Sequence, residues 1–123
     1  VPKIALVMRK AYGGSYIALV SKDMGFDMVL AWPNAEIAVM GAEQAVNIIY
    51  RKEIAGKNGD KTREQKIEEF SDKFLNPFAA ASQGKVDMII EPKSTRQSLV
   101  RCLKMLVSKR DKRPAKKHGN MPI

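Results

Sequence analysis

The chain has 123 residues, of which 45% are hydrophobic and 28% are charged, and its formal net charge is +9 at pH 7. This length fits one domain and this hydrophobic content suffices for a core, which excludes a chain disordered throughout. One cysteine and one histidine exclude an internal disulfide and a metal site built from the usual Cys and His ligands, and no apolar run reaches the length of about 18 residues that a membrane-spanning helix needs.

A short apolar run occupies residues 3–8, between Pro2 and a basic pair. Its length and its β-branched members favour a buried strand over a helix. Two adjacent glycines, Gly13 and Gly14, join this run to a helical segment that is apolar almost all round, which predicts a helix in the protein interior. The apolar residues of that segment are Tyr16, Ile17, Leu19 and Val20.

The same order of strand, glycine and helix follows a second time. Residues 28–32 and 36–40 each predict a buried strand, and Pro33-Asn34 between them predicts a turn. Gly41 then precedes a predicted helix over residues 42–50.

Two side chains in these strands need a particular environment. Glu36 lies within an apolar strand, where an unpaired carboxylate is costly. We therefore expect a basic or hydroxyl partner, and a structural ion pair first. Trp32 is expected in the core or at an interface rather than as a platform for a ligand.

Residues 54–63 contain two glycines, an Asn-Gly step and charges of both signs, which predicts a flexible surface loop. A charged helix follows it to about Leu75. The predicted buried stripe of that helix consists of Ile67, Phe70 and Phe74.

The last third predicts a short helix over residues 77–84, a strand over residues 86–90 and a final helix. Ser94 and Gln97 predict a capping box for this final helix, which should end near Arg110. Its apolar face consists of Leu99, Val100, Leu103, Leu106 and Val107. Alternating strands and helices indicate an α/β fold, and their spacing does not separate a doubly wound sheet from other α/β folds.

Basic residues concentrate towards the C-terminus, where residues 111–123 form a basic tail. The positive charge permits nucleic acid, an anionic membrane surface or a phosphorylated ligand as a partner. No aromatic residue follows Phe78 to stack on bases, so no nucleic-acid partner is expected. An RNA-binding domain stays as an alternative that steeply salt-dependent affinity for single strands would reveal. His118 in the tail is expected to be solvated or to pack rather than to catalyse.

The segment over residues 9–17 carries the clearest chemical signal. Glycines at the start of a helix expose backbone N–H groups to a ligand oxygen, and the helix dipole adds about half a positive elementary charge there. Such a turn stabilises a developing anion without an ionisable side chain. The alternative interpretation is a tight turn that only permits close helix packing.

Several motifs, taken in order, resemble one known family. They are Arg9-Lys10-Ala11-Tyr12-Gly13-Gly14, preceded by residues 1–4 and followed by residues 31–41, 76–80, 84–87, 90–92 with Thr95-Arg96, and 116–123. Together they resemble the carboxyltransferase subunit of biotin-dependent acyl-CoA carboxylases and decarboxylases, such as the propionyl-CoA carboxylase beta chain and the methylmalonyl-CoA decarboxylase alpha subunit. The resemblance covers nearly the whole chain except the polar segment at 54–63.

The resemblance implies a crotonase-like (ClpP-like) spiral of strand–strand–helix units. Residues 1–123 match only the C-terminal portion of the family's C-terminal domain, so a partial domain with exposed apolar surface is expected. The implied function is a carboxyltransferase component that moves a carboxyl group between carboxybiotin and an acyl-CoA of the propionyl- or methylmalonyl-CoA type, with this fragment inactive alone. The alternative is a non-catalytic dimerisation or assembly module.

The family also implies where the chemistry lies. Its C-terminal domain supplies backbone donors to the biotin oxygen, while the N-terminal domain of another subunit supplies those for the thioester. The matching donors here are the N–H groups of Gly14 and Ser15, with Gly13 providing conformational freedom. Many propionyl-CoA carboxylases have Asp where this chain has Ile17, so acetyl-tolerant carboxylases and decarboxylase subunits fit as well. The expected substrate-binding residues are Tyr16, Ile17, Met40 and Gly41.

The implied cofactor is biotin on a separate carrier protein or subunit. The implied partners are acyl-CoA, biotin carboxyl carrier protein, further copies of the carboxyltransferase domain in a homo-oligomer, and biotin carboxylase or membrane decarboxylase subunits. Cys102 lies in an amphipathic helical pattern that predicts an inert, partly buried thiol. A reducing compartment is therefore expected, namely the cytoplasm, or the mitochondrial matrix in a eukaryote.

Overall fold

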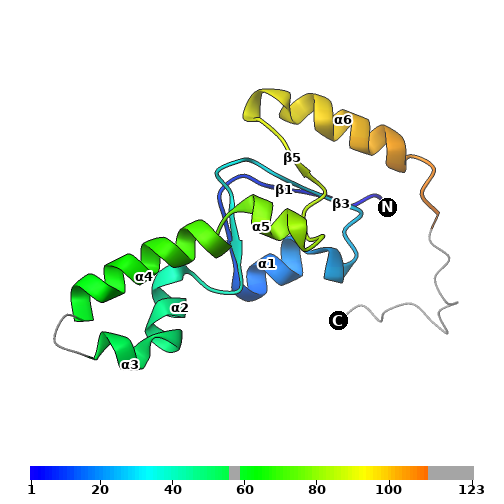
Figure 1. Cartoon of the computed structure of the whole chain (residues 1–123). Coiled ribbons are helices and arrows are strands. Elements are labelled where there is room, and N and C mark those ends of the chain that lie inside the picture. The colour runs from blue at the N-terminus through cyan, green and yellow to red at the C-terminus, as the bar shows by residue number, and fades with distance from the viewer. Residues whose placement is uncertain (56–58, 111–123) are drawn as a thin grey trace, which may run out of the picture.

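A computed structural model describes residues 1–55 and 59–110, and Figure 1 shows how their helices and strands are arranged. The elements in chain order are β1 (Ile4–Val7), β2 (Lys10–Tyr12), α1 (Gly13–Val20), the 3-10 helix η1 (Lys22–Met24), β3 (Met28–Ala31), β4 (Glu36–Ala38), α2 (Ala42–Ile49), α3 (Arg51–Ile54), α4 (Gly59–Phe74), α5 (Pro77–Ser82), β5 (Met88–Ile89), the 3-10 helix η2 (Pro92–Ser94) and α6 (Thr95–Leu106). The order strand, strand, helix occurs as β1–β2–α1 and again as β3–β4–α2.

Corresponding strands of these two units pair in parallel. β1 pairs with β3 in one sheet, and β5 adds to the other edge of β3. β2 pairs with β4 in a second sheet, in a register that places Lys10 opposite Glu36 and Tyr12 opposite Ala38. Because the paired strands are parallel, the ends of β2 and β4 meet at one edge, and the helices α1 and α2 begin beside each other.

The larger sheet separates two hydrophobic cores. In Figure 1, α6 lies on one side of β1, β3 and β5, while α1 and α5 lie on the other. Successive side chains of a strand point to opposite faces, so each strand serves both cores. The core beside α1 and α5 includes Ala5, Val7, Val29 and Ala31, and the core beneath α6 is built from Leu30, Ile90 and Cys102. Burial on both faces explains why these strands are nearly continuous apolar runs.

The turn between β3 and β4 forms where the sequence predicted it. Trp32 and Cys102 are also placed as expected, in the core and as a buried thiol. The N–H of Ala35 donates to the carbonyl of Trp32 at 3.0 Å and closes the turn through Pro33. The indole of Trp32 packs in the core beneath α6, and its Nε1 donates to the Thr95 hydroxyl at 3.0 Å. Cys102 is 1% exposed, and burial raises the pKa of its thiol.

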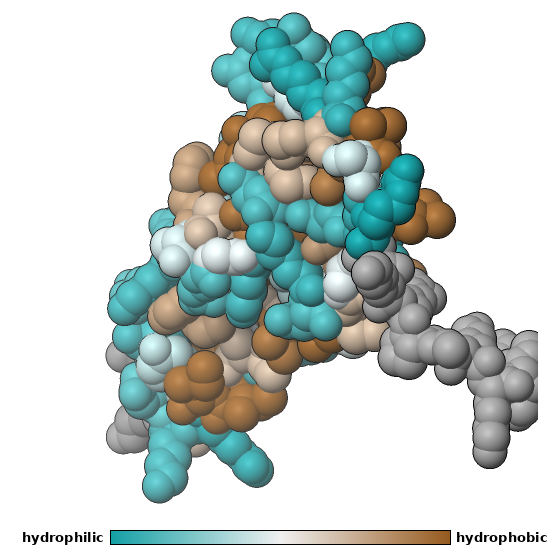
Figure 2. All heavy atoms as spheres, turned by 90° about the vertical axis from the view of Figure 1, so that its right-hand side faces the viewer, coloured by the Kyte–Doolittle hydropathy of each residue, from teal (hydrophilic) through white to brown (hydrophobic). Residues whose placement is uncertain are grey.

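Three helices expose apolar faces that the sequence assigned to the interior. Only Tyr16 is buried in α1, where Leu19 is 68% exposed. In α4 the predicted stripe is only half-buried, and Phe74 is exposed. Leu103 in α6 and Val107 directly after it are exposed, although both belong to the predicted apolar face of this helix. In the space-filling view of Figure 2, apolar side chains accordingly form separate groups on the surface among hydrophilic ones.

These corrections share one physical cause. Within the described residues, α6 packs mainly on β1 and η2, and α4 packs mainly on the helices α2, α3 and α5. A helix that is apolar over more than one face therefore has side chains left without cover. Surfaces of this kind mark places where further protein packs, as was expected of a partial domain.

Two predictions about helix starts were wrong, namely the loop predicted at 54–63 before α4 and the capping box predicted for α6. Ile54 ends α3 and Gly59 begins α4, so most of the predicted loop at 54–63 is helical, and its residues 56–58 lie outside the described residues. The hydroxyl of Ser94 donates to the carbonyl of Glu91 at 2.9 Å instead of capping α6, because η2 leads directly into that helix. Asn76 does cap α5, since its Oδ1 accepts from the N–H of Ala79 at 2.8 Å.

The basic tail at 111–123, including His118, lies outside the described residues. Across residues 1–55 and 59–110, none of the helices has the length and apolar character that crossing a membrane requires.

One carboxylate links three separate segments of the fold. Asp27 lies just before β3; its Oδ1 is 2.7 Å from Nζ of Lys109, and its Oδ2 accepts from the N–H of Lys3 at 2.7 Å. The hydrogen bond to Lys109 and then the one from Lys3 lower the pKa of Asp27 below its usual value. The pair thereby ties the segment after α6 to the start of the sheet.

This depressed pKa predicts a pH-dependent contribution to stability. The stabilising effect of Asp27 is present above its unfolded-state pKa, near pH 4, and is lost as the pH falls through the folded-state pKa. Asp27→Asn should lower the protection of β3 amides at pH 7, and the difference from the native chain should shrink towards pH 3. Hydrogen exchange corrected for its intrinsic pH dependence measures this, with Glu68→Gln on exposed α4 as the control. A difference that does not change with pH would contradict the assignment.

Candidate active site

The glycine turn, residues 13–15, joins β2 to α1 and takes a conformation that requires glycine. Gly13 has a φ of +64°, in the left-handed region that side chains disfavour. Tyr12 before it is extended, with φ −120° and ψ 147°, and provides no side-chain cap for the helix. The chain therefore turns sharply at Gly13, and the first amides of α1 follow at once.

The N–H groups of Gly14 and Ser15 belong to the first turn of α1, where an α-helix has no internal acceptors for them. Within residues 1–55 and 59–110, no acceptor from another element receives a hydrogen bond from either group. Both residues are exposed. The hydroxyl of Ser15 donates to the carbonyl of Tyr12 at 3.0 Å, so the free donor of Ser15 is its backbone N–H.

Position 14 has room for an external group. A Cβ added at Gly14 would meet no atom within 4 Å, and its φ is not positive. Nothing in the described chain therefore requires glycine there. Two adjacent, exposed backbone donors beside this open position suit an anionic oxygen such as that of the biotin ring, so the residues fit the implied cofactor.

The second glycine turn, at Gly41, packs against the first. A Cβ added at Gly13 would lie 3.5 Å from the carbonyl oxygen of Val39, and one added at Gly41 would lie 3.7 Å from Cε2 of Tyr12. Both are ordinary contact distances for an added Cβ, so the two turns lie close together with room for little more than a methyl group between them. Gly41 is the N-cap residue of α2, and no side chain makes a capping hydrogen bond there.

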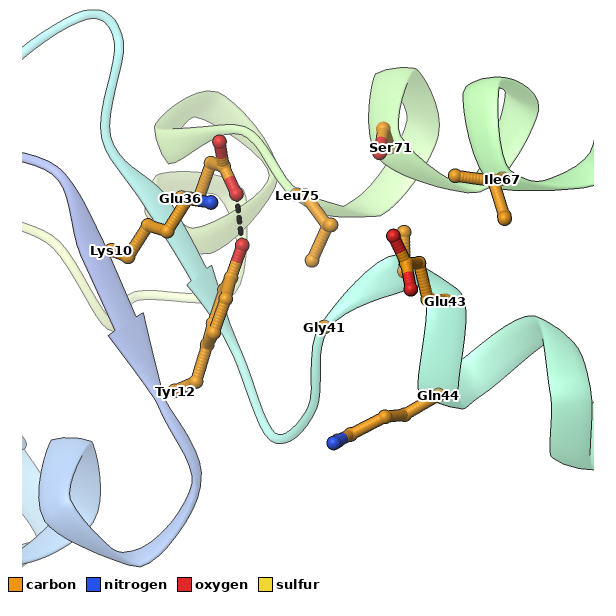
Figure 3. Close-up of a pocket in the computed structure, with 10 residues that line it drawn as sticks. Lys10, Tyr12, Glu36, Gly41, Glu43, Gln44, Ile67, Ser71 and Leu75 are labelled. Atoms are coloured by element: carbon orange, nitrogen blue, oxygen red, sulfur yellow. Dashed lines mark hydrogen bonds between the residues drawn. The ribbon is translucent and has the colours of Figure 1, made fainter. Parts of the chain in front are cut away.

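The phenol of Tyr12 donates a hydrogen bond to Oε2 of Glu36, the dashed line in Figure 3. Burial, followed by the bond to Glu36 and the charge of its carboxylate, raises the pKa of Tyr12 to about 12. Glu36 thus has the hydroxyl partner that its place in an apolar strand required. The first expectation, a structural ion pair, is wrong, because the carboxylate meets the phenol of Tyr12 two residues beyond Lys10, the residue opposite it in the register.

A cavity of about 430 Å³ opens beside this hydrogen bond. Figure 3 shows that its walls come from β2, β4, the start of α2 and one side of α4. The lining residues are Lys10, Tyr12, Glu36, Gly41, Ala42, Glu43, Gln44, Ile67, Ser71 and Leu75. The glycine turn lies next to this cavity through Tyr12 and does not line it.

The predicted substrate-binding residues do not share one cavity. Gly41 lines the large cavity, while Tyr16 is 8% exposed and lines a cavity of about 60 Å³ against β4 and α5. Ile17 is 42% exposed, and Met40 is half-buried. In the described chain, Ile17 and Met40 line neither of these cavities. The turn and the start of α2 are thus brought together, and Tyr16 is held in the core.

Sequence reasoning missed the hydrogen bond between Tyr12 and Glu36. β2 was not predicted, so nothing placed Tyr12 beside the second predicted strand pair. The available signal was the alternation of Lys10 and Tyr12, which puts both side chains on one face of a strand. No three His, Cys, Asp or Glu side chains within residues 1–55 and 59–110 come together as a set that could hold a metal ion.

A family model for the carboxyl transferase domain matches residues 1–121. The chain belongs to this family. It is 56% identical over 124 residues to methylmalonyl-CoA decarboxylase subunit alpha of Propionigenium modestum, covering 100% of this chain and 24% of that protein. It is 55% identical over 123 residues to the methylmalonyl-CoA carboxyltransferase 12S subunit of Propionibacterium freudenreichii subsp. shermanii, again covering 24% of the relative. The chain thus spans about a quarter of the length of these curated relatives.

Solved structures of this family share the fold. A crystal structure of transcarboxylase 12S with methylmalonyl-coenzyme A and methylmalonic acid bound superposes with a TM-score of 0.90 at 55% identity, over 100% of this chain and 24% of that one. The beta subunit of geranyl-CoA carboxylase from P. aeruginosa gives a TM-score of 0.72 at 23% identity, over 87% of this chain and 21% of that one, a likeness of fold alone. The predicted crotonase-like α/β fold, present as a partial domain, is confirmed.

The two glycines of the turn should respond oppositely to alanine. Gly13→Ala forces a side chain into the left-handed region and should destabilise the subunit that carries this chain by about 1–2 kcal/mol. Gly14→Ala meets open space at a helix position, so its effect on stability should be near zero or slightly favourable. Thermal unfolding of the two variants side by side measures the difference. Equal losses of stability would contradict this description of the turn.

Proposed function

We propose that this chain is part of a carboxyltransferase that moves a carboxyl group between carboxybiotin and an acyl-CoA of the propionyl- or methylmalonyl-CoA type. The names of its relatives support this assignment, as does the methylmalonyl-coenzyme A bound in the transcarboxylase 12S structure. The observation that carries it is the exposed pair of N–H groups at Gly14 and Ser15, presented by a turn that needs glycine at position 13. The chain by itself is proposed to be inactive, because it spans only about a quarter of the length of these relatives and the donors for the thioester are expected from another domain.

The chemical work of this chain is done by its main chain. Biotin, when bound, supplies or accepts the carboxyl group, and it is carried on a separate protein. The N–H groups of Gly14 and Ser15 would hold the ring oxygen and stabilise negative charge on it. Gly13 fixes their direction, and the start of α1 adds about half a positive elementary charge. Loss of one such donor typically costs about 3 kcal/mol of transition-state stabilisation.

Other parts of the assembly complete the site in this proposal. The acyl-CoA thioester is activated by donors from another domain, and further copies of the subunit form a homo-oligomer. Exposed apolar side chains near the turn suit coverage by such a neighbour, including Ile17 and Val39. The same surface favours the alternative, an assembly module without a chemical role. The two differ in whether the amides of residues 14 and 15 matter for turnover.

A β-branched residue at position 14 should separate these functions. Gly14→Val places a branched side chain on the residue that carries one of the two donors, so carboxybiotin-dependent turnover of the full-length subunit should fall at least about 100-fold. Ala18→Val, at an exposed position one turn further along α1, is the matched control and should keep most of the activity. Size-exclusion chromatography should show the same oligomer for both.

Two outcomes would decide against the catalytic role. Undiminished turnover in Gly14→Val would show that the donors do not meet the ring oxygen. Loss of the oligomer together with turnover in that variant, with Ala18→Val normal in both respects, would favour the assembly module.

The substrate preference is proposed to depend on Ile17. This side chain lies one turn beyond Gly14 and is 42% exposed. Ile17→Ala enlarges the space beside the acyl group, so the ratio of kcat/KM for butyryl-CoA over acetyl-CoA should rise by about 10-fold or more. Leu19→Ala, at a 68% exposed position on another face of α1, should leave the ratio unchanged. A constant ratio in Ile17→Ala would remove this residue from the acyl pocket.

A further inference from the structure

Tyr12 holds the glycine turn through its side chain and its main chain. It is the last residue of β2, and its carbonyl accepts the hydroxyl of Ser15 at 3.0 Å. Its ring lies beside the second turn, where a Cβ on Gly41 would be 3.7 Å from Cε2. Its phenol donates to Glu36 on β4. One residue therefore contacts both glycine turns and the neighbouring strand.

The bond between Tyr12 and Glu36 is well suited to fixing an orientation. It joins β2 to β4 through a carboxylate, and hydrogen bonds to charged acceptors are roughly twice as strong as neutral ones. Each strand is only three residues long, so few ladder bonds share the task. The raised pKa of Tyr12, about 12, keeps the phenol protonated as a donor over the physiological range.

The position of this bond also argues against a purely packing role. Both residues are half-buried, and both line the cavity of about 430 Å³ rather than the hydrophobic core. Figure 3 shows the phenol and the carboxylate pointing toward each other across the gap between the strands, with Lys10 alongside. A phenylalanine would give the same ring contact with Gly41 without this link, so the hydroxyl is what the strand pair uses.

We propose that Tyr12 and Glu36 are positioning residues for the carboxyl transfer, because their hydrogen bond sets the direction of the Gly14 and Ser15 donors. This inference rests on the proposed function of the glycine turn. The pair does not touch the reacting atoms. It acts through the backbone at Tyr12, which leads directly into Gly13.

Kinetics of the full-length subunit test the role. Tyr12→Phe removes the donor and Glu36→Ala removes the acceptor, so either should lower kcat for carboxyl transfer by about 10- to 100-fold, the effect of misdirecting a catalytic group by about 1 Å. The KM for the acyl-CoA should stay within about twofold, since those contacts lie elsewhere. Glu36→Gln keeps an oxygen acceptor of the same length and should recover most of kcat. Tyr50→Phe, another half-buried tyrosine, is the control.

Hydrogen exchange gives a readout that does not depend on turnover. In the free subunit, Tyr12→Phe should raise the exchange rates of the backbone amides of β4, which pair with β2 and include the bond from the N–H of Glu36 to the carbonyl of Arg9 at 2.7 Å, while the β3 amides in the larger sheet stay protected. Glu36→Gln should leave both regions unchanged. If Glu36→Ala does not fold, the exchange rates and the kcat of Tyr12→Phe test the proposal without it.

The outcomes separate this inference from the function it rests on. Full turnover in Gly14→Val overturns the proposed function. If Gly14→Val is inactive while Tyr12→Phe keeps full kcat and native exchange of the β4 amides, the positioning role alone is overturned. A loss of kcat in Tyr12→Phe with no recovery in Glu36→Gln and unchanged exchange also overturns it, since the effect would then not pass through this bond.

Discussion

The parallel pairing of β2 with β4 is the constraint on which the rest of the site depends. Parallel strands place their ends at the same edge, and each of these strands is followed at once by a glycine turn and a helix. The starts of α1 and α2 therefore lie together, although Gly13 and Gly41 are 28 positions apart in the sequence. The register of this one strand pair therefore determines where the donors of the first turn lie and where the cavity beside the second turn lies.

The sequence predicted the elements whose signals are local. β1 and β3 are apolar runs with clear boundaries, and the turn at Pro33 needs only its own residues. β2 was missed because a three-residue strand with Lys10 and Tyr12 has no apolar pattern, and it exists through its pairing with β4. The bond from Tyr12 to Glu36 spans 24 positions, so it depends on a register that one sequence does not specify.

The exposure of apolar helix faces was the other property that the sequence did not predict. The patterns of α1, α4 and α6 correctly marked apolar faces, but a pattern does not state which neighbour covers a face. Leu19, Phe74 and Val107 face outward because the described part of the chain has nothing to place over them. The need for glycine at position 13 was predictable, since a left-handed residue before a helix has few alternatives. The open space at position 14 emerged only with coordinates.

A donor set made of peptide groups has a consequence for the enzyme's acid–base behaviour. Amide hydrogens do not titrate in the range where enzymes operate, so the affinity proposed for residues 14 and 15 towards a negative oxygen would not vary with proton concentration. In that proposal, any inflection in the rate profile of the assembled protein originates in titratable side chains outside this turn, whether they belong to this chain or to its partners. The turn itself would contribute an electrostatic element of constant strength.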